Sequence, residues 1–478
     1  MTRRFGALLA GLCCATAIAA VDTPEAATGR SFALIRANPA RLWPFLREMP
    51  KGGDLHNHLS GAIYAESYLR WAAEDGLCLA TATMTIVSGT CDAGTDRPAV
   101  SAVLQNAALY SQAVDAMSMR NWHAASNGHD HFFATFSRFN LPSNSRTGDM
   151  LAEVASRAAA EHVSYLELMI TPDGGTAARR GRAAGWGADL GRQREKLLAT
   201  GFREAVVGEV RSQLDAAETR RDELLACGTP KADPGCTVTI RYISQVARAG
   251  PPEAVFAQIL AGFEAATADP RVVSFNLVQP EDNPTAVRDF SLHMSMIDFL
   301  HPQYPRVPIA LHADELAPGM VAPEAMRFHV RDSMRRGHAR RIGHATGVMH
   351  EDAALELLRE MAARKVLVEV ALSSADQILG VKGNRHPLRT LLAFGVPVAI
   401  VTDDMGVSRS THTQEFMKAV DEQGLDYRTM KALVRNSIEY SFADPAAKTQ
   451  LKTDLEKAFR AFEAGISKAA RPTTASEF

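Results

Sequence analysis

Short apolar runs that end in polar, reactive residues recur along this chain and constrain its fold more than any other feature. Several are continuous apolar stretches, as expected for strands that are buried on both faces of a parallel sheet. Eight such runs are present: Asp54–His58, Val163–Glu167, Val238–Ile243, Val272–Leu277, Pro308–His312, Arg341–His344, Val366–Val370 and Val398–Asp403. Each run is a candidate strand.

Stretches with helical spacing separate most of these runs. Ile259, Leu260 and Phe263 fit one helix face, and Leu355 and Leu358 fit the face of another helix. Alternation of strand and helix favours the α/β class, and eight strands predict a (β/α)8 TIM barrel.

Two connections are longer than the rest. They cover residues 72–160 and 171–237 approximately, after the first and second strands, and the second includes a helical stretch at 191–225. We interpret both as helical insertions into one domain that covers residues 21–478.

The first twenty residues have the pattern of a secretory signal peptide. Arg3 and Arg4 precede a largely apolar stretch over 5–21, and small alanines follow its centre. The stretch is short for a membrane helix, which needs about 20 apolar residues, although a retained membrane anchor is the alternative. The arginine pair also fits a twin-arginine signal. We expect a signal peptide over 1–20 and a periplasmic or secreted protein with no stable membrane association after signal removal.

Cysteine usage agrees with export. Two of the six cysteines fall in the expected signal peptide, and the remaining four allow three pairings. Pairing the sequence neighbours, Cys78 with Cys91 and Cys227 with Cys236, would close two short loops in an oxidising compartment. Unpaired buried thiols are the alternative.

The composition excludes two broad classes of protein. The chain carries 52 Lys+Arg against 54 Asp+Glu, a net charge of −2, which argues against a nucleic-acid binder. Hydrophobic residues make up 46%, too many for a disordered chain.

Polar residues gather where the predicted strands end, which is where barrel enzymes place their active sites. His56 and His58 alternate at the strand period, so both imidazoles point to one side. His312 and His344 end two later runs, and the pair 403–404 is Asp-Asp. Each of these residues taken alone could serve packing or capping. Together, three neutral imidazoles and a carboxylate form a normal zinc set, and bound zinc lowers the pKa of water toward about 7.

With these motifs in order, the sequence resembles the adenosine deaminase family of the amidohydrolase superfamily. The resemblance rests on Met-Pro-Lys-Gly-Gly-Asp-Leu-His-Asn-His-Leu at 49–59, His-Ala-Asp-Glu at 312–315, Arg-Ile-Gly-His at 341–344 and Thr-Asp-Asp at 402–404. Matching blocks run from residue 49 to about 439. In its expected signal peptide and its cysteines, the chain is more similar to the secreted, growth-factor-related branch than to the compact members of the family.

The resemblance implies a single zinc ion per chain and a purine nucleoside substrate. The implied zinc ligands are His56, His58, His312 and Asp403.

The resemblance also implies three catalytic roles. His344 would take a proton from the attacking water, and Glu315 would protonate N1 of a purine that is attacked at C6. Asp404 would hydrogen-bond N7 of the purine. For its task Glu315 needs a raised pKa, which burial can supply.

Four positions depart from the family pattern. Ser60 stands where compact members have an acid that helps to hold the ribose 5′ end, and Gln279 stands near a glycine whose backbone meets purine N3. Asp314 and Ala375 replace a small residue and an asparagine. Ser60 and Gln279 are therefore predicted substrate-binding positions, and we expect their contacts with the substrate to differ from those in the compact members.

Three further histidines, His123, His129 and His131, cluster in the first insertion. Their spacing matches no reliable ligand set, and we expect them in a solvated or substrate-gating loop.

Three functions compete. The first is an exported zinc-dependent deaminase of adenosine or 2′-deoxyadenosine in purine salvage. The second is an amidohydrolase that deaminates another 6-aminopurine or hydrolyses a different ring. The third is a non-catalytic secreted signalling protein, which would be expected to have lost part of the metal or acid–base set. The helical insertions could also support a homodimer.

Overall fold

The computed structural model describes residues 23–92, 94, 96–122 and 128–469, so the expected signal peptide lies outside the described residues. A strand occurs at each of the eight predicted positions. The barrel strands are β1 (Gly52–His58), β4 (Val163–Ile170), β5 (Thr239–Ala247), β6 (Val272–Val278), β7 (Ala310–Ala313), β8 (Arg341–His344), β9 (Leu367–Val370) and β10 (Val398–Ile400). All their pairings are parallel, and they form two half-barrels in the orders β1-β4-β5-β6 and β10-β9-β8-β7.

Backbone hydrogen bonds join the two halves between β1 and β10. Asn57 forms a parallel bridge with Asp403. The His58 amide donates to the Asp403 carbonyl at 3.2 Å, and the Asp403 amide donates to the His56 carbonyl at 2.9 Å. This seam therefore positions three predicted metal ligands directly.

Side chains of β6 close the other seam, against β7. Ser274 Oγ accepts from the Ala310 amide at 3.2 Å, and Asn276 Oδ1 accepts from the His312 amide at 2.7 Å. These two side chains satisfy strand amides that a backbone ladder would otherwise pair. With both seams joined, the predicted (β/α)8 fold is confirmed.

Helices surround the barrel. Those that follow β5 and the later strands are α11 (Pro252–Ala268), α12 (Pro284–Leu300), α13 (His329–Arg335), α14 (Ala354–Arg364), α15 (Leu372–Leu379), α16 (Leu388–Ala393), α17 (Met405–Ser408), α18 (His412–Asp421) and α19 (Tyr427–Glu439). Ile259, Leu260 and Phe263 are buried on α11, as predicted.

The predicted apolar face of α14 was partly wrong. Leu355 is 44% exposed, whereas Leu357, Leu358 and Met361 are buried. At 3.6 residues per turn, Leu355 lies about 200° around the helix from Leu357, on the solvent side.

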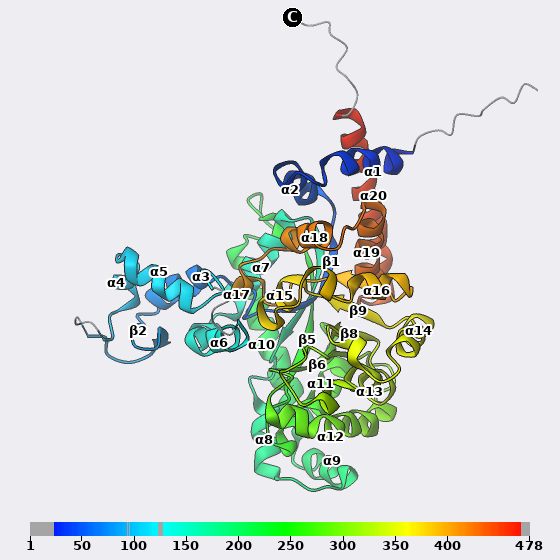
Figure 1. Cartoon of the computed structure of the whole chain (residues 1–478). Helices are drawn as coiled ribbons and strands as arrows, with labels where there is room; N and C mark the ends of the chain where they lie inside the picture. Colours follow the sequence, from blue (N-terminus) through cyan, green and yellow to red (C-terminus); the bar gives the residue numbers. More distant parts are fainter. Residues whose placement is uncertain (1–22, 93, 95, 123–127, 470–478) are drawn as a thin grey trace, which may run out of the picture.

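The first insertion lies beside the barrel (Figure 1). It comprises α3 (Ala65–Glu74), β2 (Cys78–Ala80), β3 (Thr85–Val87), α4 (Val100–Val103), α5 (Ala107–Ala116), α6 (Gly128–Ser145) and α7 (Thr147–Ala160). It is mainly helical, as expected. The antiparallel hairpin of β2 and β3 was not predicted, because strands of three residues are too short to show an alternating pattern.

The second insertion is helical as well. It consists of α8 (Thr176–Ala184), α9 (Leu190–Leu198), α10 (Phe202–Leu224) and a short 3-10 helix (Pro234–Thr237). The helical stretch predicted at 191–225 is two helices, because the chain breaks at Gly201, whose φ is +69°. Glycine adopts this left-handed conformation without a steric penalty.

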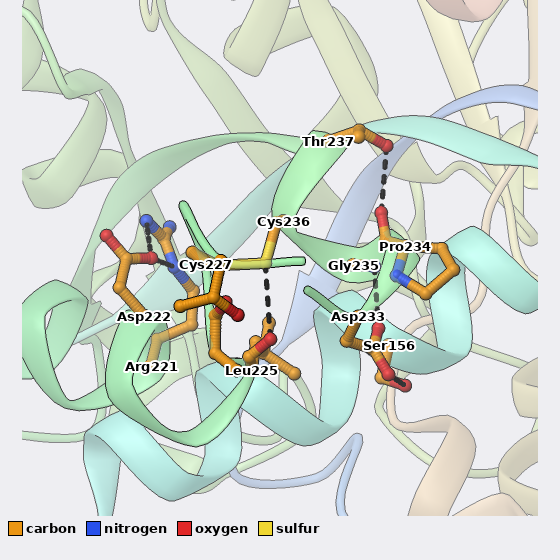
Figure 2. Close-up of a disulfide and its surroundings, with 12 residues drawn as sticks. Ser156, Arg221, Asp222, Leu225, Cys227, Asp233, Pro234, Gly235, Cys236 and Thr237 are labelled. Carbon is orange, nitrogen blue, oxygen red and sulfur yellow. Dashed lines mark hydrogen bonds and ion pairs between the residues drawn. A yellow bond between two sulfur atoms is a disulfide. The ribbon is translucent and has the colours of Figure 1, made fainter. Parts of the chain in front are cut away.

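Both local cysteine pairings are confirmed. Cys78 is bonded to Cys91 and Cys227 to Cys236, with Cα–Cα distances of 5.5 and 5.6 Å. Figure 2 shows the second bond between the turn after α10 and the 3-10 helix that precedes β5. Asp233 caps this 3-10 helix at the Gly235 amide.

The first and last described helices pack together at one end of the molecule (Figure 1). They are α1 (Pro24–Ile35) and α20 (Pro445–Ala469), and α2 (Pro39–Glu48) leads from α1 toward β1. None of the helices in the described part of the chain is long and apolar enough to cross a membrane.

Candidate active site

A cavity of about 530 Å³ opens at the C-terminal ends of the barrel strands. Its floor is polar and acidic, and α6 supplies an aromatic wall. Its lining includes His58, Ser60, Phe132, Phe133, Phe136, Asn140, Thr171, Gln245, Gln279, His312, Glu315, Asp403 and Asp404.

The four predicted zinc ligands meet at the base of this cavity. The Nε2 atoms of His56 and His58 each lie 3.4 Å from Asp403 Oδ1. His312 Nε2 lies 3.2 Å from His58 Nε2. His344 is close enough that it, His56, His312 and Asp403 each offer a ligand atom within 4.8 Å of the others.

Outer partners turn two of these rings toward the common centre. His56 Nδ1 lies 2.8 Å from Glu369 Oε2, and His312 Nδ1 lies 2.9 Å from Asn276 Oδ1. In the tautomer in which each Nδ1 donates to its oxygen, the Nε2 lone pairs are available and face the common centre. His56 Nε2 is buried and has no hydrogen-bond partner among the described residues. Lone pairs that converge in this way fit a bound cation.

His58 has a different outer partner. Its Nδ1 lies 3.1 Å from the side-chain amide of Gln245, which in turn lies 3.3 Å from Thr171 Oγ1. Sequence reasoning missed both residues, because a glutamine and a threonine at strand ends carry no recognisable motif.

A buried arginine supports the metal set from below. Arg341 Nε lies 2.6 Å from Glu369 Oε1, and its Nη2 lies 2.5 Å from Glu167 Oε2. All three side chains are buried. The arginine charge keeps Glu369 ionised, and its pKa lies below the usual range despite burial. An ionised Glu369 is the form that accepts the His56 proton.

Glu315 and His344, the predicted proton donor and proton acceptor, lie close together. Glu315 Oε1 lies 3.8 Å from His344 Nδ1 and accepts a hydrogen bond of 3.1 Å from Ser374 Oγ. Burial raises the pKa of the Glu315 carboxyl, and the neighbouring imidazole of His344 opposes that rise. The raised pKa matches the requirement for a proton donor.

Asp404 lies beside Asp403 and is also buried. Its Oδ1 has no hydrogen-bond partner among the described residues. Burial, and then the negative charges of Asp403 and Glu315, raise its pKa well above the usual range. A protonated Asp404 could donate to a ring nitrogen of a ligand.

Two glycines make room for these side chains. A Cβ at Gly61 would lie 1.6 Å from Asp404 Oδ1, and a Cβ at Gly343 would lie 2.7 Å from His56 Cε1. Only glycine allows the backbone to approach these side chains so closely.

Several residues at the cavity have left-handed backbones. The φ angles are +57° at Asp403, +69° at His344, +62° at Asp314 and +83° at Gln279. Such conformations are uncommon for residues other than glycine and collect at functional sites. They turn the chain sharply where these strands end.

Ser60 and Gln279, the two predicted substrate-binding positions that depart from the family pattern, both line the cavity. The Gln279 side-chain oxygen accepts from the Ala249 amide at 3.0 Å, and its carbonyl accepts from Arg248 Nε at 2.9 Å. Gln279 thus occupies a left-handed position that suits glycine, and its side chain is held back against the loop after β5. Ser60 carries a smaller side chain than the acidic residue that it replaces in the family pattern.

The two extra histidines in the described part of the chain, His129 and His131, do not join the metal set. His123 lies outside the described residues, and His131 Nε2 is 2.9 Å from the Ser118 carbonyl. His129 Nε2 lies 3.0 Å from Asp282 Oδ1, in the loop after β6. Hydrogen bonding to Asp282 raises the pKa of His129 to about 9. His129 and His131 lie on α6, the helix that walls the cavity.

Known proteins share this architecture. The structure aligns with the Arabidopsis N6-mAMP deaminase MAPDA at a TM-score of 0.58 and 18% identity, covering 87% of this chain and 99% of that one. A zinc-bound amidohydrolase from Burkholderia ambifaria also aligns at a TM-score of 0.58, with 15% identity, covering 89% and 94%. At these identities the likeness shows a common fold.

Curated relatives match over shorter stretches. An adenosine deaminase of Enterococcus faecalis is 33% identical over 154 residues, 32% of this chain and 42% of the relative. An aminodeoxyfutalosine deaminase of Streptomyces coelicolor is 26% identical over 202 residues, 41% of this chain and 49% of the relative. The chain thus spans less than half the length of these two relatives.

The family model described as adenosine deaminase matches residues 102–458. That match covers well over half of the chain and includes the ends of seven of the eight barrel strands. Together with the barrel and the cluster at its mouth, it shows that this chain belongs to the adenosine deaminase family.

Proposed function

We propose that this chain is a zinc-dependent deaminase that converts adenosine and 2′-deoxyadenosine into inosine and 2′-deoxyinosine with release of ammonia. One observation carries the proposal. Imidazole lone pairs converge beside two buried acids, Glu315 and Asp404, whose pKa values are raised. Metal-assisted addition of water to a purine needs metal ligands and proton donors side by side, and this combination supplies both.

The residues present fit one zinc ion. His56, His58, His312 and Asp403 would hold it, since their donor atoms are those that zinc prefers and Glu369 and Asn276 orient two of the rings. When bound, zinc would lower the pKa of a water and make a nucleophile available at neutral pH.

The side chains around this centre would handle the protons. Glu315 would donate to N1 of the purine, which makes C6 electrophilic, and Asp404 would donate to N7. His344 would accept the proton that the attacking water loses. A bond forms between the water oxygen and C6, the bond from C6 to the amino nitrogen breaks, and that nitrogen leaves as ammonia after receiving a proton.

We further propose that the protein acts outside the cytoplasm, in the periplasm or after secretion. The signal-like start of the sequence and the two disulfides support this location, because disulfides persist in oxidising compartments.

Deamination of a different 6-aminopurine is the second candidate. Ser60 and Gln279 favour it, because these two departures change the cavity wall where the sugar and the purine edge would lie. Relatives named as deaminases of adenine and of aminodeoxyfutalosine are consistent with variation in substrate within this family.

The decisive assay follows the ultraviolet spectrum of adenosine with the zinc-loaded chain and with a Glu315→Gln variant. We expect wild-type protein to convert the adenosine spectrum into that of inosine, and the variant to lose about 10²- to 10⁴-fold in kcat because its amide cannot donate the proton. An unchanged adenosine spectrum with tightly bound zinc would reject adenosine and leave the other aminopurines to be tested.

A further inference from the structure

A second cavity of about 560 Å³ adjoins the catalytic one. Ser60, Asn140, Thr171 and Gln245 line both cavities, so these four side chains form a common wall. The second cavity continues from this wall toward the loop after β4 and toward α10, where Gln213 lines it.

The lining of the second cavity is polar but uncharged. Besides the common wall, its polar side chains are Ser143, Asn144, Thr147 and Gln213. None of the described residues that line it is acidic or basic. Amides and hydroxyls can both donate and accept hydrogen bonds, so the chamber suits a neutral group with hydroxyl or carbonyl oxygens.

The catalytic groups determine which end of a substrate faces this chamber. In the proposed reaction Glu315 would meet N1 and Asp404 would meet N7, so C6 would lie between these two carboxyl groups. Asp404 packs against Gly61, the neighbour of Ser60. N7 belongs to the five-membered ring, which also carries the sugar at N9. The sugar would therefore extend from the purine on the side of Ser60.

Charge excludes one obvious occupant. A 5′-phosphate would bring about two negative charges next to the catalytic cavity, whose lining holds Glu315, Asp403 and Asp404. None of the described residues that line either cavity is lysine or arginine. A phosphate there would lack the cationic partners that proteins normally supply.

We propose that the second cavity is a subsite for a neutral, hydroxyl- or carbonyl-bearing substituent on the 5′ carbon of a 6-aminopurine nucleoside. The proposal rests on the deaminase function proposed above and names its substrate class: 5′-extended nucleosides in preference to nucleotides. Ser60 lines both cavities, so a larger acidic side chain there would take up space at their boundary.

The first test compares kcat/KM for adenosine, AMP and 5′-O-ribosyladenosine, which carries a neutral hydroxyl-rich extension. We expect the ribosyl compound to exceed adenosine by about tenfold, as two net hydrogen bonds would give, and AMP to be the poorest of the three. A ribosyl compound no better than adenosine, or AMP as the best substrate, would overturn the subsite while leaving the deaminase intact. If none of the three is deaminated, both proposals fail.

The second test fills the chamber. Gln213→Trp and, independently, Asn144→Trp place a large ring at exposed positions of the lining, on α10 and α6. We expect each to lower the ratio of kcat/KM for ribosyladenosine over adenosine about tenfold. Ser212→Trp, one residue away, exposed and outside the lining, should keep the wild-type ratio. An unchanged ratio in a folded filling variant contradicts the proposal.

Discussion

Asn276, on the neighbouring strand, orients His312. The side-chain Oδ1 of Asn276 lies within hydrogen-bond distance of both the backbone amide and the ring Nδ1 of His312. An Asn276→Ala variant loses both contacts and lets the ring turn. We expect zinc affinity to fall about 10- to 100-fold, as outer partners of metal ligands typically contribute.

Competition with a chelator of known zinc affinity measures this effect. Asn276→Asp is the matched control, because it keeps an oxygen at the same place and should retain zinc nearly as well as the wild type. Equal zinc affinity in all three proteins would show that Asn276 does not orient His312.

The residues predicted from sequence to do chemistry share one property. His56, His58, His312, Glu315 and Asp403 stand next to apolar runs, so a strand end plus a reactive side chain could be recognised directly. Their supporting partners could not be recognised in this way. Glu369 lies inside a strand and Gln245 near the end of another, and only the closed barrel shows that each faces a histidine.

At the scale of elements, α6 forms a wall of the cavity and is tied to the opposite rim. Phe132, Phe133 and Phe136 project from it into the cavity lining, and His129 pairs with Asp282 in the loop after β6. The helix is therefore held in place by a pair that depends on pH.

We expect α6 to loosen in alkaline solution. The pKa of His129 is raised to about 9 by Asp282 and Asp130, so the pair contributes fully below the unfolded value of about 6.5 and loses its contribution as pH rises through about 9. Hydrogen exchange of α6 amides, corrected for intrinsic rates, should quicken between about pH 8 and 10. An Asp282→Asn variant should show a flatter dependence. If the corrected exchange rates of the α6 amides stayed the same across this pH range, the pair of His129 and Asp282 would not hold the helix in place.

The barrel elements could be predicted well because short apolar runs with polar ends recur eight times and most are separated by helical stretches. The break at Gly201 and the hairpin of β2 and β3 could not, since one glycine and two strands of three residues give weak local signals. The second cavity is formed by residues from the loops after β1 and β4 and from β4, β5, α6, α7 and α10, and no sequence period relates such distant segments.

At the scale of the whole molecule, one disulfide closes a loop in each of the two insertions. The bond between Cys227 and Cys236 closes a loop with a sequence separation of 9. Replacing both cysteines by serine should lower the free energy of unfolding by about 2–3 kcal/mol, mainly because the unfolded chain gains freedom.

Urea unfolding of the oxidised wild type and of the double serine variant measures this loss. When wild-type protein is kept reduced, its free energy of unfolding should fall toward that of the double serine variant. An unfolding free energy that does not change on removal of the bond would show that it adds no stability to the second insertion.

The central claim is that this barrel adds water to an aminopurine carbon and expels ammonia. Its most direct test is incubation of the zinc-loaded chain with adenosine in ¹⁸O-labelled water, followed by mass spectrometry of the nucleoside and measurement of ammonia. The account predicts inosine that carries one solvent oxygen and one ammonia per inosine formed. Release of the free base, or an unlabelled product, would contradict hydrolytic deamination at C6.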